Sequence, residues 1–530
     1  MDELTLLNGD FYTQDPGQPN AQAVAIREGR FVAVGSSAQI RELVPPGGRT
    51  IDLEGRRVLP GLSDAHLHLY DWSLGLQRLQ LAGVRSRAEL RQRLAQRAGL
   101  TQPGDWILGG GWNETRWPVP RMPTRVDLDA VTPEHPAILW RSDLHLAVAN
   151  TLALGQAGIT TDTPDPADGV IDRDATGQPT GVLRELAINL VRDVIPPPTG
   201  RDALDAIEHG IGELHRLGLT GIHDYRLMGG ADGPPAFGAY QRLSSLGKLD
   251  LRLWMQLPGE RLDEVLELGL RSGFGDACLR IGHLKLFADG GQGARTAWML
   301  EPYQDTGTCG MPLMPVEELA DAVRRAEQAG LAVAVHAIGD RANRQVLDLF
   351  ERGESSPGAI PHRMEHVQNI RPDDVVRLGR LGIVASVQPI HVTDDIAVIE
   401  GSVGERSRFA YPFRDMVDAG VPLALGSDAP VADPNPLWGI HAAVTRQRRD
   451  GSPVGGWYPA QRLTVAEAIW GYTMGAAQAS GRQAELGSIA PGKLADLVVL
   501  DRDILTVDAM EIAHCQVIMT VFDGRVVFET

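Results

Sequence analysis

Two histidines that lie two residues apart are the first feature of the sequence that could do chemistry. His66 and His68 end the apolar run in LSDAHLHLYDW. Side chains two apart on a strand point to the same face, roughly 6.6 Å apart along the backbone, so both imidazoles can converge on one divalent metal ion. The pair could equally fill a pleated face as ordinary buried residues, and alone it indicates a metal only weakly.

Three more polar residues end apolar, strand-like runs. His336 ends LAVAVHA, His366 ends HRMEH and Asp428 ends LALGSD. The carboxyl ends of the strands form the active-site rim of a (β/α)₈ barrel, and core packing gives no reason to place imidazoles and a carboxylate there. Together with the first two histidines, these residues indicate a metal site.

Lys285, in LRIGHLKLFADGG, lies within a strand rather than at its tip, and two interpretations are open. The lysine could reach solvent or pair with a nearby acid such as Asp289. Beside two metal ions, desolvation and positive charge would instead lower its pKa, and the neutral amine could take up CO₂ to become an anionic carbamate. That carbamate would bridge the ions.

The elements that must position these residues alternate between helices and short apolar strands, which is typical of a parallel sheet or barrel. Helices are predicted over 202–218, 316–330 and 372–382, where apolar residues recur at helical spacing before a glycine. The candidate strands are one too many for an eight-stranded barrel. The extra one is AILWRSD (137–143), because it lies in a stretch from about 84 to 200 that is rich in Pro, Gly and Asp. We assign that stretch to an insertion after the first barrel strand.

The two ends of the chain differ from the middle. Residues 1–57 and 486–530 contain short strand-like runs punctuated by glycine and charge, and they predict one composite β-sandwich domain. Residues 58–485, with the insertion, then form an α/β domain, a (β/α)₈ TIM barrel. A chain of 530 residues is long enough for a barrel of about 250 residues with added parts.

Composition excludes several classes of partner. The formal charge of -18 argues against binding to nucleic acid or to an anionic membrane surface, because both need a basic protein surface. No apolar run reaches the length of a transmembrane helix, and the first residues do not have the composition of a secretory signal. Three scattered cysteines are too few for a disulfide framework. We therefore expect a cytoplasmic protein.

Seven motifs, spread over nearly the whole chain, together resemble one known family: PGLSDAHLH, GGGWNETRWP, LKLFADGG, VHAIGDRAN, HRMEH, SDAP and GSIAPGKLADLVVLD. They resemble the amidohydrolase superfamily (amidohydrolase family 3), and specifically the YtcJ-like branch that includes N-substituted formamide deformylases. The resemblance implies ligands from strands one, four, five, six and eight: His66 and His68, carboxylated Lys285, His336, His366 and Asp428. The strand count without AILWRSD places these residues on the same strands.

The resemblance also implies a mechanism. Two divalent ions, expected to be Zn²⁺, would ionise a bridging water near neutral pH and thereby supply hydroxide. His66, His68 and Asp428 would hold one ion, His336 and His366 the other, and Lys285, as its carbamate, would join them. Asp428 would in addition be catalytic, because it could take the proton of the water and pass it to the leaving nitrogen.

Four residues are candidates for substrate binding. Trp112, Asn113 and His145 lie in the insertion and resemble positions where this branch lines its pocket, although His145 could equally be a surface residue. His391 follows strand seven, on the expected rim, and could contact substrate.

The leading hypothesis is a metal-dependent amidohydrolase that cleaves a linear, non-peptide C–N bond of amide or formamide type in a small molecule. A cyclic amide, lactone or ester is the alternative substrate class, because the same metal-activated hydroxide attacks any polarised carbonyl. A catalytically inactive assembly module is the non-enzyme alternative, and it is disfavoured because no expected ligand is missing. A homodimer is one expectation for the assembly.

Overall fold

The structure is a computed structural model that describes residues 3–43, 48–114, 117–141, 146–166, 169–185, 187–225, 233–352 and 360–530. The chain divides into two compact units. Unit 1 contains Met1–Trp72 and Ile207–Thr530, and unit 2 contains Ser73–Ala206. The predicted insertion, about 84–200, is shorter than unit 2 at both ends.

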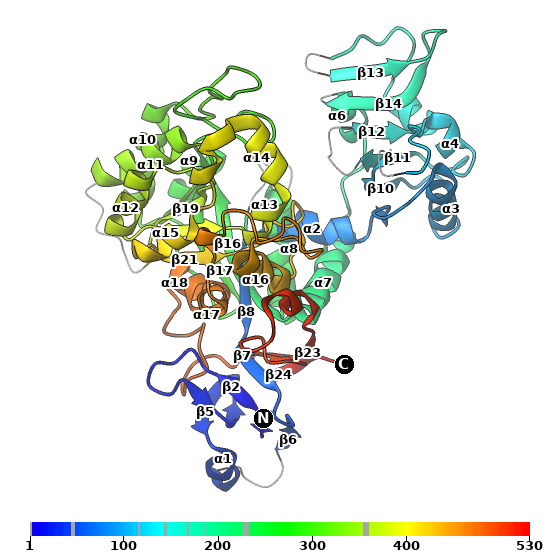
Figure 1. The fold of residues 1–530 in the computed structure, drawn as a ribbon. Coiled ribbons are helices and arrows are strands. Elements are labelled where there is room, and N and C mark those ends of the chain that lie inside the picture. The colour runs from blue at the N-terminus through cyan, green and yellow to red at the C-terminus, as the bar shows by residue number, and fades with distance from the viewer. Residues whose placement is uncertain are drawn as a thin grey trace. The chain divides into compact units, whose positions relative to one another are not determined.

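Eight parallel strands form the central sheet of unit 1 (Figure 1). In chain order these strands are β8 (Leu62–Leu67), β15 (Leu219–Asp224), β16 (Arg252–Pro258), β17 (Leu279–Phe287), β18 (Val333–Ala337), β19 (Arg363–His366), β20 (Val384–Val387) and β21 (Leu423–Leu425). Each strand pairs in parallel with the next one along the chain. The sheet closes on itself where Leu67, at the end of β8, forms a parallel bridge with Ala429, just beyond β21. The predicted (β/α)₈ barrel is confirmed.

Helices lie between the barrel strands along the chain and follow the last of them. They are α7 (Gly200–Arg216), α8 (Gly233–Ser245), α9 (Leu262–Glu267), α10 (Val316–Gln328), α11 (Asp340–Arg352), α12 (Pro372–Leu381), α13 (Pro389–Asp394), α14 (Ile396–Val403), α15 (Phe413–Asp418), α16 (Pro436–Thr445), α17 (Val465–Trp470) and α18 (Ala476–Ala479). The strands are buried on both faces, as expected when helices cover a parallel sheet. Within the described part of the chain, none of the helices is long and apolar enough to span a bilayer.

Both ends of the chain build a β-sandwich, which confirms the predicted composite domain. One sheet has the order β5-β4-β1-β6, and the other has the order β24-β23-β22-β7-β2-β3. Their bounds are β1 (Glu3–Leu7), β2 (Asp10–Tyr12), β3 (Asn20–Ala21), β4 (Ala23–Arg27), β5 (Arg30–Gly35), β6 (Arg49–Asp52), β7 (Arg57–Pro60), β22 (Leu497–Leu500), β23 (Val517–Phe522) and β24 (Arg525–Glu529). Leu6, Val24, Val58, Val499 and Val521 pack in one core between the sheets.

The boundary between sandwich and barrel lies slightly later than the sequence suggested. Strand β7 pairs with β22 of the sandwich, so residues 58–60, which were assigned to the barrel, belong to the terminal domain. The apolar run VLPGLSDAHLHL therefore contains two strands, one in each sheet, and Gly61 lies between them. A Cβ atom at Gly61 would lie 2.2 Å from the Thr220 hydroxyl, so only glycine fits at this passage.

Unit 2 has its own six-stranded sheet, of order β13-β14-β12-β11-β10-β9. Its strands are β9 (Leu79–Gln80), β10 (Ile107–Trp112), β11 (Ala137–Arg141), β12 (Leu146–Ala149), β13 (Gly169–Arg173) and β14 (Pro179–Glu185). Its helices are α3 (Arg87–Ala98), α4 (Arg125–Asp129), α5 (Thr151–Gln156) and α6 (Ala187–Arg192). The extra candidate strand AILWRSD contains β11, which belongs to this sheet and not to the barrel.

Candidate metal centre

The six predicted metal ligands lie at the same end of the barrel. His66 is on β8 and His68 directly follows it, while Lys285, His336 and His366 come from β17, β18 and β19, and Asp428 follows β21. These strands are the first, fourth, fifth, sixth and eighth of the barrel, as the sequence indicated. The side chains of all six are buried or nearly so.

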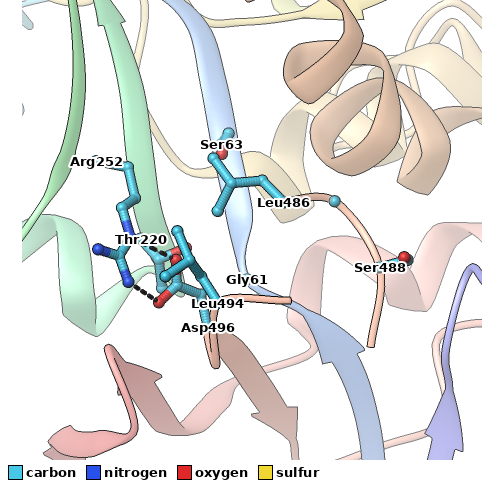
Figure 2. A pocket seen from close by; sticks show the side chains of 9 residues that line it. Gly61, Ser63, Thr220, Arg252, Leu486, Ser488, Leu494 and Asp496 are labelled. Carbon is cyan, nitrogen blue, oxygen red and sulfur yellow. Dashed lines mark hydrogen bonds and ion pairs between the residues drawn. The ribbon is translucent and has the colours of Figure 1, made fainter. Parts of the chain in front are cut away.

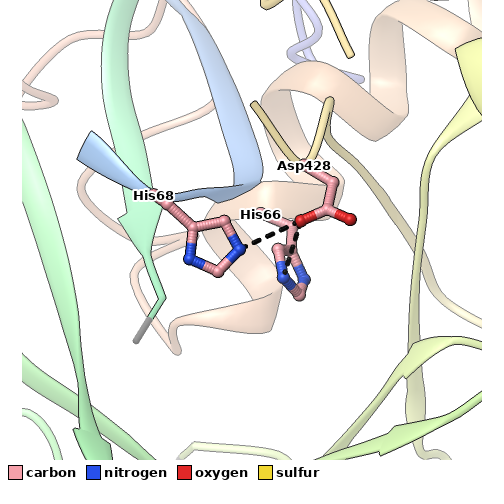
Figure 3. A group of neighbouring side chains, drawn as sticks. All are labelled: His66, His68 and Asp428. Carbon is pink, nitrogen blue, oxygen red and sulfur yellow. Dashed lines mark hydrogen bonds and ion pairs between the residues drawn. The ribbon is translucent and has the colours of Figure 1, made fainter. Parts of the chain in front are cut away.

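Three of these residues already have the spacing of metal ligands (Figure 3). Asp428 Oδ1 lies 3.1 Å from His68 Nε2 and 3.5 Å from His66 Nε2. A second group, His366, His391 and Asp428, also has ligand atoms within 4.8 Å of one another. Asp428 is common to both groups.

The remaining imidazoles pack beside this carboxylate. The ring centroid of His366 lies 4.8 Å from that of His66 and 4.6 Å from that of His336. His66, His366 and His336 thus form a continuous row of imidazoles, and His68 extends it at 5.6 Å from His66.

Each of the first two histidines has one ring nitrogen occupied by an acceptor. His66 Nδ1 donates to Glu365 Oε2 at 2.7 Å, and His68 Nδ1 donates to the carbonyl of Tyr225 at 3.0 Å. Because carboxylate and carbonyl oxygens only accept, the proton of each neutral ring is fixed on Nδ1. In the neutral rings each Nε2 presents its lone pair on the side of Asp428, where an ion could bind. In its protonated form, His68 Nε2 instead donates a hydrogen bond of 3.1 Å to Asp428 Oδ1.

The other two histidines are held in the same manner. His366 Nδ1 lies 2.9 Å from Gln388 Oε1, which leaves Nε2 as its ligand atom. His336 uses the opposite nitrogen, because its Nε2 donates to the carbonyl of Gly290 at 3.3 Å and Nδ1 remains. Such partners orient metal-binding imidazoles and fix their tautomers.

Glu365 is a residue of the site that the sequence reasoning missed. Its Oε1 accepts hydrogen bonds from Arg363 Nε at 2.8 Å and from the Tyr225 hydroxyl at 2.7 Å. Burial favours the neutral acid, but the charge of Arg363 and the hydrogen bond from His66 outweigh it and hold the pKa of Glu365 well below its usual value. The Tyr225 ring stacks on His66 with centroids 3.7 Å apart. The signal in the sequence was the motif HRMEH, in which an arginine and a glutamate alternate along one strand.

The electrostatics keep most of the predicted ligands in their metal-binding protonation states. His68 differs, because burial favours its neutral ring but the hydrogen bond to the Asp428 carboxylate outweighs burial and raises its pKa. Burial lowers the pKa of His66 to about 4 and that of His336 to about 3. For Asp428, burial favours the neutral acid, but the neighbouring histidines outweigh it and hold its pKa well below the usual value. Neutral imidazoles and a carboxylate are the forms that bind a metal, so the donor set fits a divalent ion of the zinc class at neutral pH.

Lys285 does not pair with Asp289, which was one of the two interpretations of this lysine. Its Nζ lies 4.7 Å from the centroid of the Tyr225 ring and 4.9 Å from that of Phe287. Asp289 instead accepts hydrogen bonds from the backbone N–H groups of Trp298, Ile338 and Gly339. Burial lowers the pKa of Lys285 to about 8, so part of the amine is neutral near physiological pH.

The backbone is strained at two of the predicted ligands. His366 has φ of 72° and Asp428 has φ of 62°, in the left-handed region that non-glycine residues rarely adopt. The Asp428 N–H donates to the carbonyl of His66 at 2.7 Å, which ties this turn to β8. Strain of this kind costs of order 1–3 kcal/mol and persists where the surrounding structure imposes it, commonly at functional sites.

The four predicted substrate-binding residues have different surroundings. Trp112 is fully buried in the core of unit 2, where its indole N–H donates to the carbonyl of Leu139 at 3.2 Å. Asn113 Oδ1 accepts a hydrogen bond from Arg141, and His145 lies outside the described residues. His391, on α13, lies among the predicted ligands. For Trp112, the core packing accounts for the burial without a substrate.

A family model described as an amidohydrolase family matches residues 49–528. The chain belongs to this amidohydrolase family. The match spans the barrel, unit 2 and the part of the sandwich from β6 onward, and it includes every predicted ligand.

Three curated relatives of this amidohydrolase match over nearly their whole length. A protein named LONG AFTER FAR-RED 3 from Arabidopsis thaliana is 35% identical, covering 94% of this chain and 87% of the plant protein. The putative amidohydrolase YtcJ of Bacillus subtilis is 33% identical, covering 98% of each chain. An N-substituted formamide deformylase of Arthrobacter pascens is 30% identical, covering 100% of this chain and 99% of that enzyme. The expected YtcJ-like resemblance is confirmed.

A solved structure agrees with the fold. An uncharacterized metal-dependent hydrolase from Pyrococcus horikoshii superposes with a TM-score of 0.79 and 32% identity, over 96% of this chain and 99% of that one. The amidohydrolase described here is therefore a metal-dependent hydrolase that acts on carbon–nitrogen bonds of small molecules.

Proposed function

We propose that this amidohydrolase hydrolyses a linear, non-peptide C–N bond of the formamide or N-acyl amine type. The observation that carries the proposal is the buried group of His66, His68 and Asp428, with two further imidazoles beside it, each presenting one nitrogen to the same space. The deformylase of Arthrobacter pascens, which matches over the whole chain, supports the substrate class.

The residues present fit two divalent ions, and Zn²⁺ suits their nitrogen and oxygen donors. His66, His68 and Asp428 would hold one ion, and His336 and His366 the other, with Lys285 as a carbamate between them. When bound, the ions would polarise the substrate carbonyl and lower the pKa of a water in the site. The neutral fraction of the Lys285 amine, from a pKa of about 8, is the form that reacts with CO₂.

Asp428 would move the proton. Its pKa is held well below the usual value, because the surrounding histidines outweigh the effect of burial, so it is a carboxylate that can accept a proton from water. It would then return the proton to the leaving nitrogen, since an amine leaves readily only when protonated. Glu365 would hold His66 in the orientation that this geometry needs.

Asn113 and His145 stay predictions for substrate binding, as does Trp112, whose ring is enclosed in the core of unit 2. A cytoplasmic location and a homodimer also stay predictions.

The test is a substrate panel on zinc-loaded protein. Matched N-formyl, N-acetyl and cyclic amides, with a lactone and an ester, would be compared by kcat/KM. We expect the linear N-formyl or N-acyl amides to be the best substrates, with activity lost on chelation and restored by about two Zn²⁺ per chain.

Two variants test whether hydrolysis depends on the predicted metal site. Asp428→Asn should abolish hydrolysis, whereas Asp433→Asn, a change of the same kind a few residues away, should not. A preference for the cyclic amide or the lactone would contradict the proposed substrate class, and full activity of metal-free protein would contradict the mechanism.

A further inference from the structure

His391 is a buried histidine whose ring is only partly satisfied. It lies on α13, directly beyond β20, and it is 7% exposed. Among the described residues, its Nε2 has no hydrogen-bond partner. Buried polar atoms in folded proteins are nearly always paired, so an unpaired imidazole nitrogen indicates a ligand that it would bind.

The surroundings of this nitrogen identify the kind of ligand. His391 Nε2 lies 3.9 Å from Asp428 Oδ2, and the ligand atoms of His366, His391 and Asp428 all lie within 4.8 Å of one another. Two nitrogen or oxygen ligands of a tetrahedral zinc ion are roughly 3.4 Å apart, given bonds of about 2.0–2.1 Å. Small side-chain adjustments would therefore bring these three atoms onto one ion.

The two oxygens of Asp428 face different groups. Oδ1 is the atom near His66 and His68, whereas Oδ2 is the atom near His391. A carboxylate placed in this way can donate one oxygen to each of two neighbouring ions.

The local structure also couples His391 to another ligand. Gln388, whose Oε1 holds His366 Nδ1, accepts a backbone hydrogen bond from the His391 N–H at 3.2 Å. The turn that begins α13 therefore contains both Gln388, which orients the His366 imidazole, and His391 itself.

We propose that His391 is a further metal ligand, which with Asp428 joins His366 and His336 around the second divalent ion, and that Asp428 bridges the two ions. The inference rests on the metal centre of the proposed function and changes the role expected for His391 from substrate contact to metal binding. The two roles differ in what they predict, because a ligand sets metal affinity and a substrate contact sets KM.

The experiment titrates metal-free protein with Co²⁺, which takes zinc sites and absorbs visible light. Wild type should bind two equivalents. His391→Gln should bind the first with unchanged affinity and the second at least about tenfold more weakly. His441→Gln is the matched control, because His441 is also buried on a neighbouring helix with an unpartnered Nε2 but is in neither ligand group.

A second variant keeps the test decisive if His391→Gln folds poorly. His391→Cys places a thiolate at the same position, and a thiolate bonded to Co²⁺ gives a sulfur-to-metal charge-transfer band in the near ultraviolet. Wild type, which has Cys278, Cys309 and Cys515, supplies the baseline. We expect the new band only in His391→Cys.

Two outcomes would overturn the proposal: wild-type affinity for both equivalents in His391→Gln, or no charge-transfer band in His391→Cys that has bound two ions. Either outcome with a raised KM on an amide substrate would return His391 to substrate binding. The titration does not use turnover, so a protein that binds metal as expected but cleaves no formamide contradicts only the proposed function.

Discussion

The imidazoles of the centre present one nitrogen each because a hydrogen bond occupies the other. Glu365 is the most consequential of these partners, since it is a fully buried carboxylate that binds His66, Arg363 and Tyr225 at the same time. Arg363 provides the charge that keeps it ionised, and an ionised partner raises the basicity of the imidazole it holds. Metal affinity should thus depend on a residue that is not itself a ligand.

Glu365→Gln tests this dependence. The amide has an N–H₂ group where the carboxylate has an acceptor, so one of its three donors must lose its partner. We expect metal affinity to fall about 10–100-fold, measured by competition with a chromophoric chelator. Glu327→Gln is the control, because Glu327 also binds a histidine, His362, at 3.0 Å but away from the centre. Equal affinities in both variants would contradict the role of Glu365.

Lys285→Ala tests the carbamate. Activity should be lost and partly restored by acetate or propionate, which can occupy the place of the carbamate, whereas Lys248→Ala at an exposed ion pair should change nothing. Unchanged metal content and rate in Lys285→Ala would exclude the role.

The pH dependence of carbamate formation follows from the pKa of Lys285, which burial lowers to about 8. Only the neutral amine reacts with CO₂, and this form decreases as pH falls below the pKa. At constant dissolved CO₂, reactivation of metal-free protein should therefore slow about fivefold from pH 8 to 7 and about tenfold for each further pH unit, as followed by stopped assays of hydrolysis. A rate independent of pH would argue against a carbamate.

At the scale of elements, the centre depends on the closure between β8 and the end of β21. Asp64 Oδ1 accepts from the backbone N–H groups of His66 and Ser427, and so joins the two strand ends. Gly426 permits this approach, because a Cβ atom there would lie 2.5 Å from the backbone nitrogen of His66. The position of Asp428 thus follows from how closely two strands meet.

Gly426→Ala should force these strand ends apart. We expect a loss of about 1–3 kcal/mol in stability, as for overpacked cores, and weaker binding of the first Co²⁺ equivalent, measured by thermal unfolding and titration. Gly401→Ala, in α14 with open space around its Cβ position, should instead leave metal binding unchanged and stabilise the helix by up to about 1 kcal/mol. Normal metal binding in Gly426→Ala would contradict this dependence.

At the scale of the whole molecule, the barrel and the sandwich of unit 1 are joined by a buried arginine (Figure 2). Arg252, at the amino end of β16, makes two hydrogen bonds of 2.9 Å to Asp496 and one of 2.8 Å to Asp523. It lines a small pocket with Thr220 and Ser488, at the end of the barrel opposite the metal centre. The pocket and the ion pairs thus belong to the domain junction and not to catalysis.

Arg252→Met should leave the buried Asp496 without its charge partner. We expect a loss of about 3–5 kcal/mol in stability, the typical cost of removing one member of a buried pair, measured as a lowered melting temperature. Arg525→Met breaks an exposed pair with Asp250 and should cost about 0–1 kcal/mol. Equal effects of the two substitutions would show that the junction does not depend on Arg252.

The sequence by itself determined the order of the barrel strands and the strand end on which each predicted ligand lies. Apolar periodicity and polar residues at strand ends are local signals, so they can be recognised in the sequence without knowledge of distant contacts. The same signals identified the composite terminal domain. They misplaced its boundary, because one continuous apolar run, VLPGLSDAHLHL, contains strands of two sheets.

Only the tertiary structure decided which atoms meet. His66 and Glu365 are 299 residues apart in the chain, and His391 approaches Asp428 from a different strand end, so no local pattern could pair them. Likewise only the structure showed that Trp112, whose role in substrate binding stays a prediction, is enclosed in the core of unit 2. Hydrogen bonds and metal sites require distances of a few ångströms between residues far apart in sequence, and closing the barrel sets those distances.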